Sequence, residues 1–214
     1  MDIKNERREY LQSGEEGLRS SDLNDNPFSQ FAHWLDEAKA GDIKDPTGMM
    51  LATVDAQGQP HQRTVLLKAF SEQGFSFFTN LGSRKASHIQ QNQAVSLIFP
   101  WLSMERQVII SGKAVALSAK DNAEYFSTRP RDSQLAAWVS RQSQPTPNKQ
   151  TLFDAFAATT AQFADKDVAL PTFWGGFRVE PSRIEFWSGS AKRLHDRFEY
   201  NKQGDSWSRQ RLQP

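Results

Sequence analysis

The 214-residue sequence predicts an α+β fold built around a closed or partly closed antiparallel β-barrel. Short β-rich runs recur along the chain, and Gly-containing turns separate several of them. Helix-like segments stand between these runs, without the regular strand–helix alternation that is typical of a doubly wound sheet. The pattern therefore favours antiparallel strands with peripheral helices, and the sequence contains no internal repeat.

The first 25 residues are polar and charged and show no periodic apolar pattern. We therefore expect residues 1–25 to form a mobile arm and residues 26–214 to form a single domain. The domain begins with an amphipathic helix from Asn26 to about Ala40, because Asn26 and Pro27 form a cap and first-turn signal. The apolar residues that recur there at helical spacing are Phe28, Phe31, Trp34, Leu35 and Ala38.

The rest of the domain alternates between expected strands and inserted helices. We expect strands at 49–54, 63–68, 75–79, 94–101 and 107–117, with turns at 55–58 and near 73–74. We expect helices at 83–92, 119–127, 133–139 and 152–163, with a polar loop at 141–149. Four further strands are expected at 177–179, 184–187, 195–200 and 206–212.

The composition argues against several classes of function. The sequence has no cysteine, which excludes disulfides, thiolate metal sites and a cysteine nucleophile. No two of its four histidines stand at a ligand-like spacing, so we expect no metal. The 26 basic and 25 acidic residues are balanced, which argues against a nucleic-acid binder. No apolar run approaches a membrane span and the start lacks a signal-peptide pattern, so we expect a cytoplasmic protein that binds no membrane.

The glycine fingerprints of nucleotide binding are absent, so a phosphate ligand needs another kind of site. The best candidate is the segment 80–85, in which a strand ends, turns at Gly82 and starts a helix. Ser83 stands at the cap position, and Arg84 and Lys85 add positive charge beside the free N–H groups of the helix start. A plain capped helix with two solvated basic residues explains the same pattern.

Arg63 and Lys68 bracket an apolar strand. Alternation puts Arg63, Val65 and Leu67 on one face and Thr64, Leu66 and Lys68 on the other. The two cations then serve two different anions, unless both simply reach solvent at the strand ends.

Two further clusters suit an anionic ligand. Tyr125, Arg129 and Ser133 recur at intervals of four, and Pro130 predicts a kink between two helices that can still converge on a phosphate. In the segment 193–197, which begins an expected strand, alternation puts Arg193, His195 and Arg197 on one side and Leu194 on the other. Three cation-capable groups on one face are costly to bury without an anion, and no G-x-S-x-G elbow supports a hydrolase triad.

These clusters together resemble the bacterial pyridoxine/pyridoxamine 5′-phosphate oxidase family over essentially the whole chain. The segments that carry the resemblance are RREY at 7–10, RTVLLK at 63–68, FTNLGSRK at 78–85, FPW at 99–101, ERQ at 105–107, STRPRDSQ at 127–134, FWGGFR at 173–178 and RLHDR at 193–197.

The resemblance implies an FMN-binding split β-barrel with Greek-key-like antiparallel topology, in which two subunits form two flavin sites across a homodimer interface. It implies oxidation of pyridoxine 5′-phosphate and pyridoxamine 5′-phosphate to pyridoxal 5′-phosphate, with O2 as the electron acceptor and H2O2 as the product. The arm would form a lid over the substrate.

The resemblance also assigns residues by position. The implied FMN-binding residues are Arg63, Thr64, Val65, Leu66, Leu67, Lys68, Phe78, Thr79, Arg84, Lys85, Gln107, Gln142, Ser143, Trp187 and Arg197. The implied substrate-binding residues are Arg7, Arg8, Glu9, Tyr10, Lys68, Tyr125, Arg129, Ser133, Arg193, Leu194 and His195. Arg193 and His195 are the implied catalytic pair, framing the pyridine ring over the flavin.

The chain departs from the family pattern at two places. Phe78 stands where a tyrosine is common, and the arm segment 11–17 looks longer and more acidic. Three other functions remain open: another split-barrel flavoprotein such as a flavin reductase or an oxidase of a different substrate, a non-catalytic FMN- or pyridoxal-phosphate-binding protein, and a nucleic-acid binder. The sequence contains two sets of candidate phosphate-binding residues, one for the cofactor and one for the substrate, and this favours the oxidase.

Overall fold

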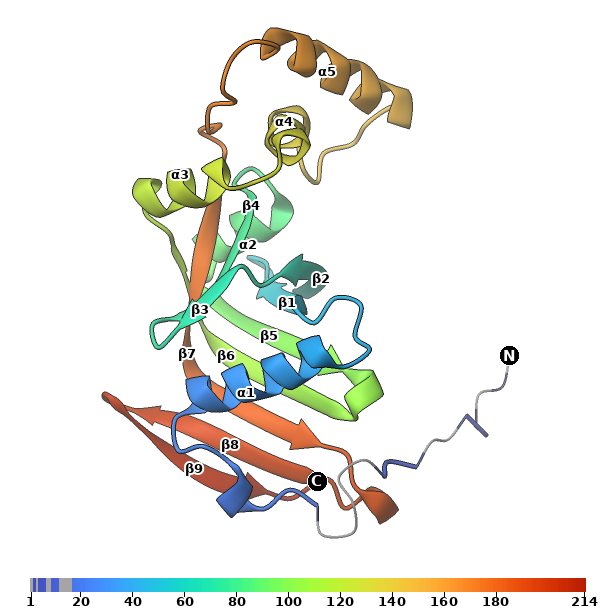
Figure 1. The fold of residues 1–214 in the computed structure, drawn as a ribbon, viewed down its shortest axis with the longest axis vertical. Helices are drawn as coiled ribbons and strands as arrows, with labels where there is room; N and C mark the ends of the chain where they lie inside the picture. The colour runs from blue at the N-terminus through green and yellow to red at the C-terminus, as the bar shows by residue number, and fades with distance from the viewer. Residues whose placement is uncertain (1, 3, 7–8, 12–16) are drawn as a thin grey trace.

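The computed structural model describes residues 2, 4–6, 9–11 and 17–214 (Figure 1). Its helices are α1 (Pro27–Ala40), α2 (Arg84–Gln91), α3 (Ala119–Ser127), α4 (Arg131–Val139) and α5 (Lys149–Gln162), with 3-10 turns η1 (Ser20–Asp22), η2 (Leu102–Met104) and η3 (Ala191–Arg193). Its strands are β1 (Gly48–Val54), β2 (Pro60–Leu66), β3 (Ala69–Ser71), β4 (Gly74–Asn80), β5 (Ala94–Trp101), β6 (Arg106–Ala116), β7 (Trp174–Ser188), β8 (Asp196–Gln203) and β9 (Ser206–Leu212). Within these residues no helix has the length and apolar character needed to cross a membrane.

The strands form one antiparallel sheet that curls into a half-barrel. The order is β2-β1-β5-β6-β7-β4-β3, so the two end strands, β2 and β3, are consecutive in the chain and are linked only by Leu67 and Lys68. This short link requires the two edges of the sheet to approach each other. Leu67 N–H donates to Thr47 O, just before β1, and Lys68 N–H donates to Ser76 O on β4, both at 2.9 Å. These bonds attach the link to both sides of the sheet. The predicted α+β barrel class is confirmed.

Strand β7 is shared by two parts of the sheet. Its first half pairs with β4, its second half pairs with β8, and β6 pairs along its whole length. The prediction of two separate strands at 177–179 and 184–187 is wrong, because Pro181 and Ser182 lie within one continuous strand. The pairing shifts at Ser111/Gly112, where a β-bulge accommodates the interruption. A Cβ on Gly112 would lie 2.1 Å from Glu180 O, so this close approach requires glycine.

Helix α1 covers the main core of the sheet (Figure 1). The Asn26 side chain accepts hydrogen bonds from the N–H groups of Phe28 and Ser29, and Pro27 occupies the first turn, as the sequence predicts. Phe31 is fully buried, with its ring centroid 4.9 Å from that of Phe75 and 4.9 Å from that of Phe99. These aromatic contacts hold α1 on β4 and β5 and make the barrel a rigid support.

A second, smaller core lies under α3, α4 and α5 at the other end of the molecule from β8 and β9 (Figure 1). Pro130 is the N-cap of α4 and separates it from α3, which confirms the predicted helix–kink–helix arrangement. Trp174, at the start of β7, packs into this core against Phe126. The helical layer is thereby joined to the sheet through β7.

The segment before α1 packs on the C-terminal strands. Leu23 is buried, the Tyr200 hydroxyl donates to Asn24 O at 2.6 Å, and Leu18 N–H donates to Asp196 Oδ2 at 2.8 Å. The predicted substrate-binding residues Arg7 and Arg8 lie outside the described residues. The mobile arm at 1–25 stays a prediction.

Candidate functional site

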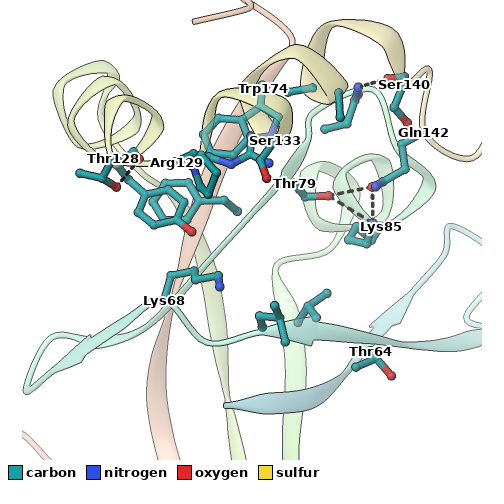
Figure 2. A pocket seen from close by; sticks show the side chains of 18 residues that line it. Thr64, Lys68, Thr79, Lys85, Thr128, Arg129, Ser133, Ser140, Gln142 and Trp174 are labelled. Carbon is teal, nitrogen blue, oxygen red and sulfur yellow. Dashed lines mark hydrogen bonds between the residues drawn. The ribbon is translucent and has the colours of Figure 1, made fainter. Parts of the chain in front are cut away.

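A cavity of about 590 Å³ lies where the ends of β2 and β4 face α3 and α4 (Figure 2). Its walls include most of the residues expected from the first two-thirds of the chain. These are Thr64, Val65, Leu66, Lys68, Phe78, Thr79, Lys85, Tyr125, Arg129, Ser133 and Gln142. Leu67 is buried beneath this wall. Folding therefore brings together segments that are far apart in the sequence.

The helical side of this cavity carries the set Lys68, Tyr125, Arg129 and Ser133. The guanidinium of Arg129 lies 4.8 Å from the centre of the Trp174 ring, and its Nη1 is buried without a hydrogen-bond partner in the described part of the protein. Burial lowers the pKa of Arg129 and raises the pKa of Tyr125. A buried donor with no acceptor is costly, so this side of the cavity suits an anion.

Phe78 contributes an aromatic wall. Its ring stacks on Tyr125 with centroids 4.0 Å apart and on Trp174 with centroids 5.3 Å apart. Trp174 was not expected as a lining residue, because its place in the cavity depends on how β7 meets the helices.

A second, adjoining cavity of about 340 Å³ is lined by a basic set. Its walls are formed by His61, Gln62, Arg63, Arg84, Lys85 and Ser143. Lys85 therefore borders both cavities, whereas Arg63 and Lys68 border different ones. Arg63 lies on β2 and Lys68 lies in the link that follows it, and their different cavities agree with the predicted separation of the two cations.

Lys85 is 9% exposed and has only neutral hydrogen-bond partners. Its ammonium donates to Thr79 Oγ1 at 3.1 Å and to Gln142 Oε1 at 2.5 Å. Burial, with a smaller contribution from the nearby charge of Arg63, lowers the pKa of Lys85 to about 8. An anion bound near this ammonium would stabilise its charged form.

Arg63 and Arg84 add to the uncompensated positive charge. Arg63 Nη1 donates to Leu51 O at 3.0 Å and to Thr53 Oγ1 at 2.7 Å, both neutral acceptors. Burial and the charge of Arg84 lower the pKa of Arg63. Across the described ranges, no salt bridge neutralises Arg63, Arg84 or Lys85. Three mutually repelling cations around one cavity are the expected features of a phosphate site.

The loop between α4 and α5 closes this basic cavity. Arg84 N–H donates to Ser143 Oγ at 3.3 Å, and Asn80 Nδ2 donates to Ser140 O at 2.8 Å. Ser143 adopts a left-handed conformation with φ of 71°. A strained non-glycine residue at this place fits a functional loop rather than a plain linker.

The remaining expected residues form a separate cluster at the far end of β7. The His195 ring lies 4.9 Å from the Trp187 ring and 5.3 Å from the Tyr10 ring, and Tyr10 also contacts Trp187 edge-on. Ser190 N–H donates to His195 Nδ1 at 3.1 Å, which fixes the ring. Gln107 pairs with Trp187 in the β6–β7 ladder, and Glu9 beside Tyr10 is exposed.

The predicted alternation of Arg193, His195 and Arg197 is wrong at its first position. Arg193 lies in η3, and Lys192 and Arg193 have left-handed φ values of 57° and 61°, which no strand tolerates. Strand β8 begins only at Asp196, and Leu194 is 67% exposed. Arg193 is therefore presented by a turn.

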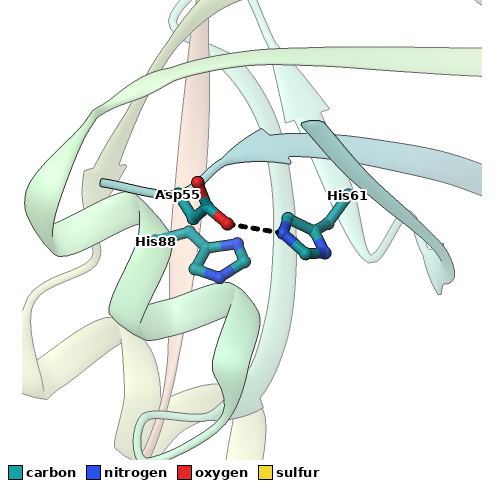
Figure 3. Close-up of side chains that lie close together, drawn as sticks. All are labelled: Asp55, His61 and His88. Atoms are coloured by element: carbon teal, nitrogen blue, oxygen red, sulfur yellow. Dashed lines mark hydrogen bonds and ion pairs between the residues drawn. The ribbon is translucent and has the colours of Figure 1, made fainter. Parts of the chain in front are cut away.

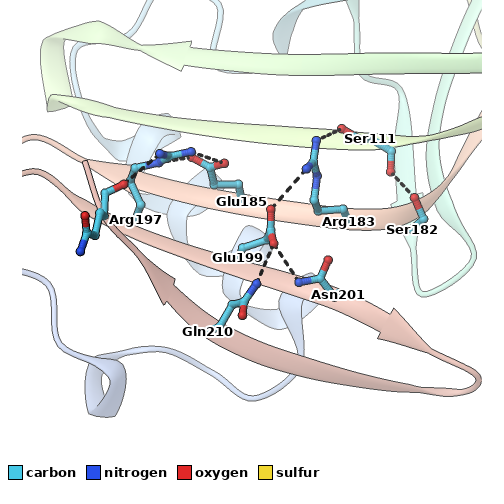
Figure 4. Close-up of polar contacts among 9 residues, drawn as sticks. Ser111, Ser182, Arg183, Glu185, Arg197, Glu199, Asn201 and Gln210 are labelled. Atoms are coloured by element: carbon cyan, nitrogen blue, oxygen red, sulfur yellow. Dashed lines mark hydrogen bonds and ion pairs between the residues drawn. The ribbon is translucent and has the colours of Figure 1, made fainter.

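Arg197 has an internal anionic partner (Figure 4). Its Nε and Nη2 donate to the two carboxylate oxygens of Glu185 at 2.9 and 3.0 Å, and this pairing raises the pKa of Arg197. The argument that three cations on one face require an external anion therefore does not apply to Arg197.

Strand β7 runs from the helical end of the molecule, near α3, to the end where it pairs with β8 (Figure 1). Trp174 lines the larger cavity and Trp187 contacts His195, and Trp187 stands 13 positions after Trp174 in one continuous strand. At ~3.3 Å per residue, the stretch of β7 between their Cα atoms is roughly 40 Å long. One chain alone therefore does not bring the two sets together.

Comparison with known proteins identifies the family of the chain. The family model described as "Pyridoxamine 5'-phosphate oxidase" matches residues 35–164, and one described as "Pyridoxine 5'-phosphate oxidase C-terminal dimerisation region" matches residues 174–214. A protein from Shewanella sp. (strain MR-7) named pyridoxine/pyridoxamine 5'-phosphate oxidase is 53% identical over 213 residues, covering 100% of this chain and 99% of its own length. The protein of that name from Shewanella amazonensis is 50% identical over the same coverage.

Solved structures show the same fold. PhzG from Burkholderia lata 383, in complex with tetrahydrophenazine-1-carboxylic acid, aligns with a TM-score of 0.86 at 27% identity, covering 92% of this chain and 98% of its own. A pyridoxamine 5'-phosphate oxidase-related, FMN binding protein from Nostoc punctiforme aligns with a TM-score of 0.72 at 17% identity, covering 87% and 96%. The latter likeness concerns the fold alone. The family match spans more than half of the sequence, and the chain belongs to the pyridoxamine 5'-phosphate oxidase family.

Proposed function

We propose that this protein is an FMN-dependent oxidase that converts pyridoxine 5′-phosphate and pyridoxamine 5′-phosphate to pyridoxal 5′-phosphate. The observation that carries the proposal is the pair of adjoining cavities, each with its own unpaired cations: Arg63, Arg84 and Lys85 in one, Lys68 and Arg129 in the other. Two phosphates, one on the cofactor and one on the substrate, suit this arrangement. Relatives at about half identity over their full length carry the same activity in their names.

The basic cavity fits the phosphate of FMN. Lys85 would exchange its neutral partners Thr79 and Gln142 for a phosphate oxygen, and the guanidinium groups of Arg63 and Arg84 would flank it. Thr64, Val65 and Leu66 line the adjoining larger cavity and would contact the body of the cofactor. When bound, FMN supplies the two-electron oxidation and the transfer of electrons to O2.

The helical side of the larger cavity fits the phosphate of the substrate. Arg129 has a buried, unpaired Nη1, and Lys68, Tyr125 and Ser133 line the same side. These groups would anchor the pyridine by its phosphate and thereby fix the distance of its 4-substituent from the cofactor. An unphosphorylated pyridine would lose this anchor.

We propose that a second copy of the chain completes each site. Arg193 and His195 follow the end of β7 that lies away from Trp174, and the strand between Trp174 and Trp187 is roughly 40 Å long. In a two-fold dimer built through the region 174–214, which matches a dimerisation region, the partner would supply these groups. Arg193 would cover the substrate ring, and His195, held by Ser190 and Trp187, would orient it.

Three alternatives are distinguishable. Another split-barrel flavoprotein would bind FMN but would not oxidise pyridoxamine 5′-phosphate, and a carrier would bind the ligand without forming peroxide. A nucleic-acid binder is disfavoured by the formal net charge of +1. The Lys68 and Arg129 set favours a phosphorylated substrate over the first alternative.

The test is a direct assay of the purified protein. The visible spectrum is recorded after incubation with FMN, pyridoxamine 5′-phosphate is added in air, and aldehyde and peroxide are followed. We expect flavin absorbance and equal amounts of both products. A flavoprotein that forms neither product would overturn the substrate, and a protein that retains no FMN would overturn the whole proposal.

A further inference from the structure

Three potential metal ligands meet beside the basic cavity (Figure 3). Asp55 lies in the turn after β1, His61 lies on β2 and His88 lies on α2. One ligand atom from each lies within 4.8 Å of the other two. Because His61 and His88 are far apart in the sequence, their spacing gave no sign of this cluster.

The carboxylate of Asp55 is held in position from its own turn. Its Oδ1 accepts the N–H groups of Gln57 and Gln59 at 3.0 and 2.9 Å. This leaves Oδ2 for the histidines, and it lies 2.8 Å from His61 Nε2. A ligand carboxylate oriented by a second hydrogen-bonded oxygen is typical of metal sites in proteins.

The two imidazoles are also held by the fold. Their ring centroids lie 4.7 Å apart. His88 is 6% exposed, and its Nδ1 lies 3.0 Å from the hydroxyl of the fully buried Thr53, which orients the ring. His61 is partly exposed and lines the basic cavity, so an ion can reach the cluster from solvent. The buried His88, the accessible His61 and the carboxylate of Asp55 thus converge from three parts of the fold.

We propose that Asp55, His61 and His88 bind a divalent transition-metal ion of the Zn²⁺ class. Two imidazole nitrogens and one carboxylate oxygen are the donors that such ions prefer, with water at the remaining position. At metal–ligand distances of about 2.0–2.1 Å, tetrahedral ligands stand ~3.3 Å apart. The observed separations, from 2.8 Å to at most 4.8 Å, bracket that value, so small side-chain rotations close the site.

The bound ion would tie the β1–β2 hairpin to α2. Helix α2 begins with Arg84 and Lys85, which border the basic cavity, and His88 lies on its next turn. Arg63 lies on β2 two residues after His61, and its Nη1 donates to Thr53 Oγ1, the same hydroxyl that contacts His88 Nδ1. The site therefore acts as a structural clamp on the basic cavity. This inference does not rest on the proposed enzymatic activity.

The test is an isothermal titration calorimetry experiment, in which the untagged full-length protein is titrated with Zn²⁺ in a phosphate-free buffer. We expect one ion per chain with about micromolar affinity or tighter. His61→Phe removes the ligand nitrogen but keeps an aromatic ring at that position, and His88→Gln keeps a polar contact to Thr53. Each substitution should weaken Zn²⁺ binding at least about tenfold. The matched control is His33→Ala, because His33 lies on the exposed face of α1 and should leave binding unchanged.

Two measurements separate loss of the site from loss of the fold. Without metal, circular dichroism should show that each variant is folded. If His88→Gln does not fold, the test uses His61→Phe alone. Zn²⁺ should raise the Tm of the wild type and of His33→Ala but not that of His61→Phe. Binding that survives both ligand substitutions, or a wild type that binds no Zn²⁺, would overturn the proposal.

Discussion

The ammonium of Lys85 lies 2.5 Å from the amide oxygen of Gln142, a neutral partner, although Lys85 is almost fully buried. We interpret this contact as a substitute for the FMN phosphate. Lys85→Met should then raise the Kd for FMN about 10- to 100-fold, the value of one charged hydrogen bond of about 1.5–3 kcal/mol. Quenching of flavin fluorescence measures the Kd. An unchanged Kd would remove Lys85 from the cofactor site.

The same lysine predicts the pH dependence of FMN binding. Its pKa is about 8 in the structure, and binding of phosphate requires the charged form. FMN affinity should therefore be highest below pH 8 and should fall by up to about tenfold per pH unit above it. Lys85→Arg should abolish this slope while keeping tight binding. The idea fails if wild type and Lys85→Arg show the same slope between pH 8 and pH 9.5.

Lys85 also predicts the pH dependence of stability in the protein without cofactor. Its folded pKa of about 8 is below the unfolded value of 10.5, so the unfolded chain binds more protons between these values. The contribution of Lys85 to the free energy of unfolding should therefore rise with pH from about 8 to 10.5. It is measured as the difference between wild type and Lys85→Met in urea unfolding. A difference that shrinks or stays constant would contradict the assigned pKa.

Arg129 separates substrate binding from cofactor binding. Arg129→Ala should raise the KM for pyridoxamine 5′-phosphate about 30- to 100-fold and leave the Kd for FMN unchanged, because Arg129 lines the larger cavity and not the basic one. Lys120→Ala, on the exposed face of α3, is the control. Equal effects of Arg129→Ala on KM and on FMN affinity would place Arg129 in a general structural role.

The pair of Arg197 and Glu185 should stabilise the C-terminal strands. Glu185→Gln removes the charged acceptor of a bidentate ion pair. Because Arg197 is partly exposed, we expect the free energy of unfolding to fall by about 1–2 kcal/mol. Glu180→Gln breaks the more exposed pair with Arg178 and should cost less than about 0.5 kcal/mol. Urea unfolding compares the two, and equal losses would contradict the account.

The local patterns in the sequence predicted most elements and one site arrangement. The cap at Asn26, the kink at Pro130 and the opposite faces of Arg63 and Lys68 all depend on neighbouring residues, and the structure agrees with them. Such features follow from local backbone geometry, which the sequence encodes directly.

Features that depend on distant contacts were missed. The continuity of β7 through Pro181 depends on a bulge opposite it in β6, and the turn at Arg193 depends on two left-handed residues without glycine. The cluster of His61 and His88 arises only when α2 packs beside β2. His61 was nevertheless within reach of the alternation argument, since it stands two residues before Arg63 on the same face.

The claim that each site draws on two chains is tested most directly by mixing two impaired variants and assaying them at substrate concentrations well below the wild-type KM. Arg129→Ala removes a cation from the larger cavity, beside the start of β7. Arg193→Ala removes a side chain of the C-terminal cluster, which follows the end of β7. Unfolding and refolding an equimolar mixture should produce heterodimers with one intact site each, and thus recover roughly a quarter of wild-type activity. Mixing Arg129→Ala with Lys68→Ala, both in the cavity set, should recover none. Activity that stays absent in the first mixture, although heterodimers form, would contradict a shared site and place both sets within one chain.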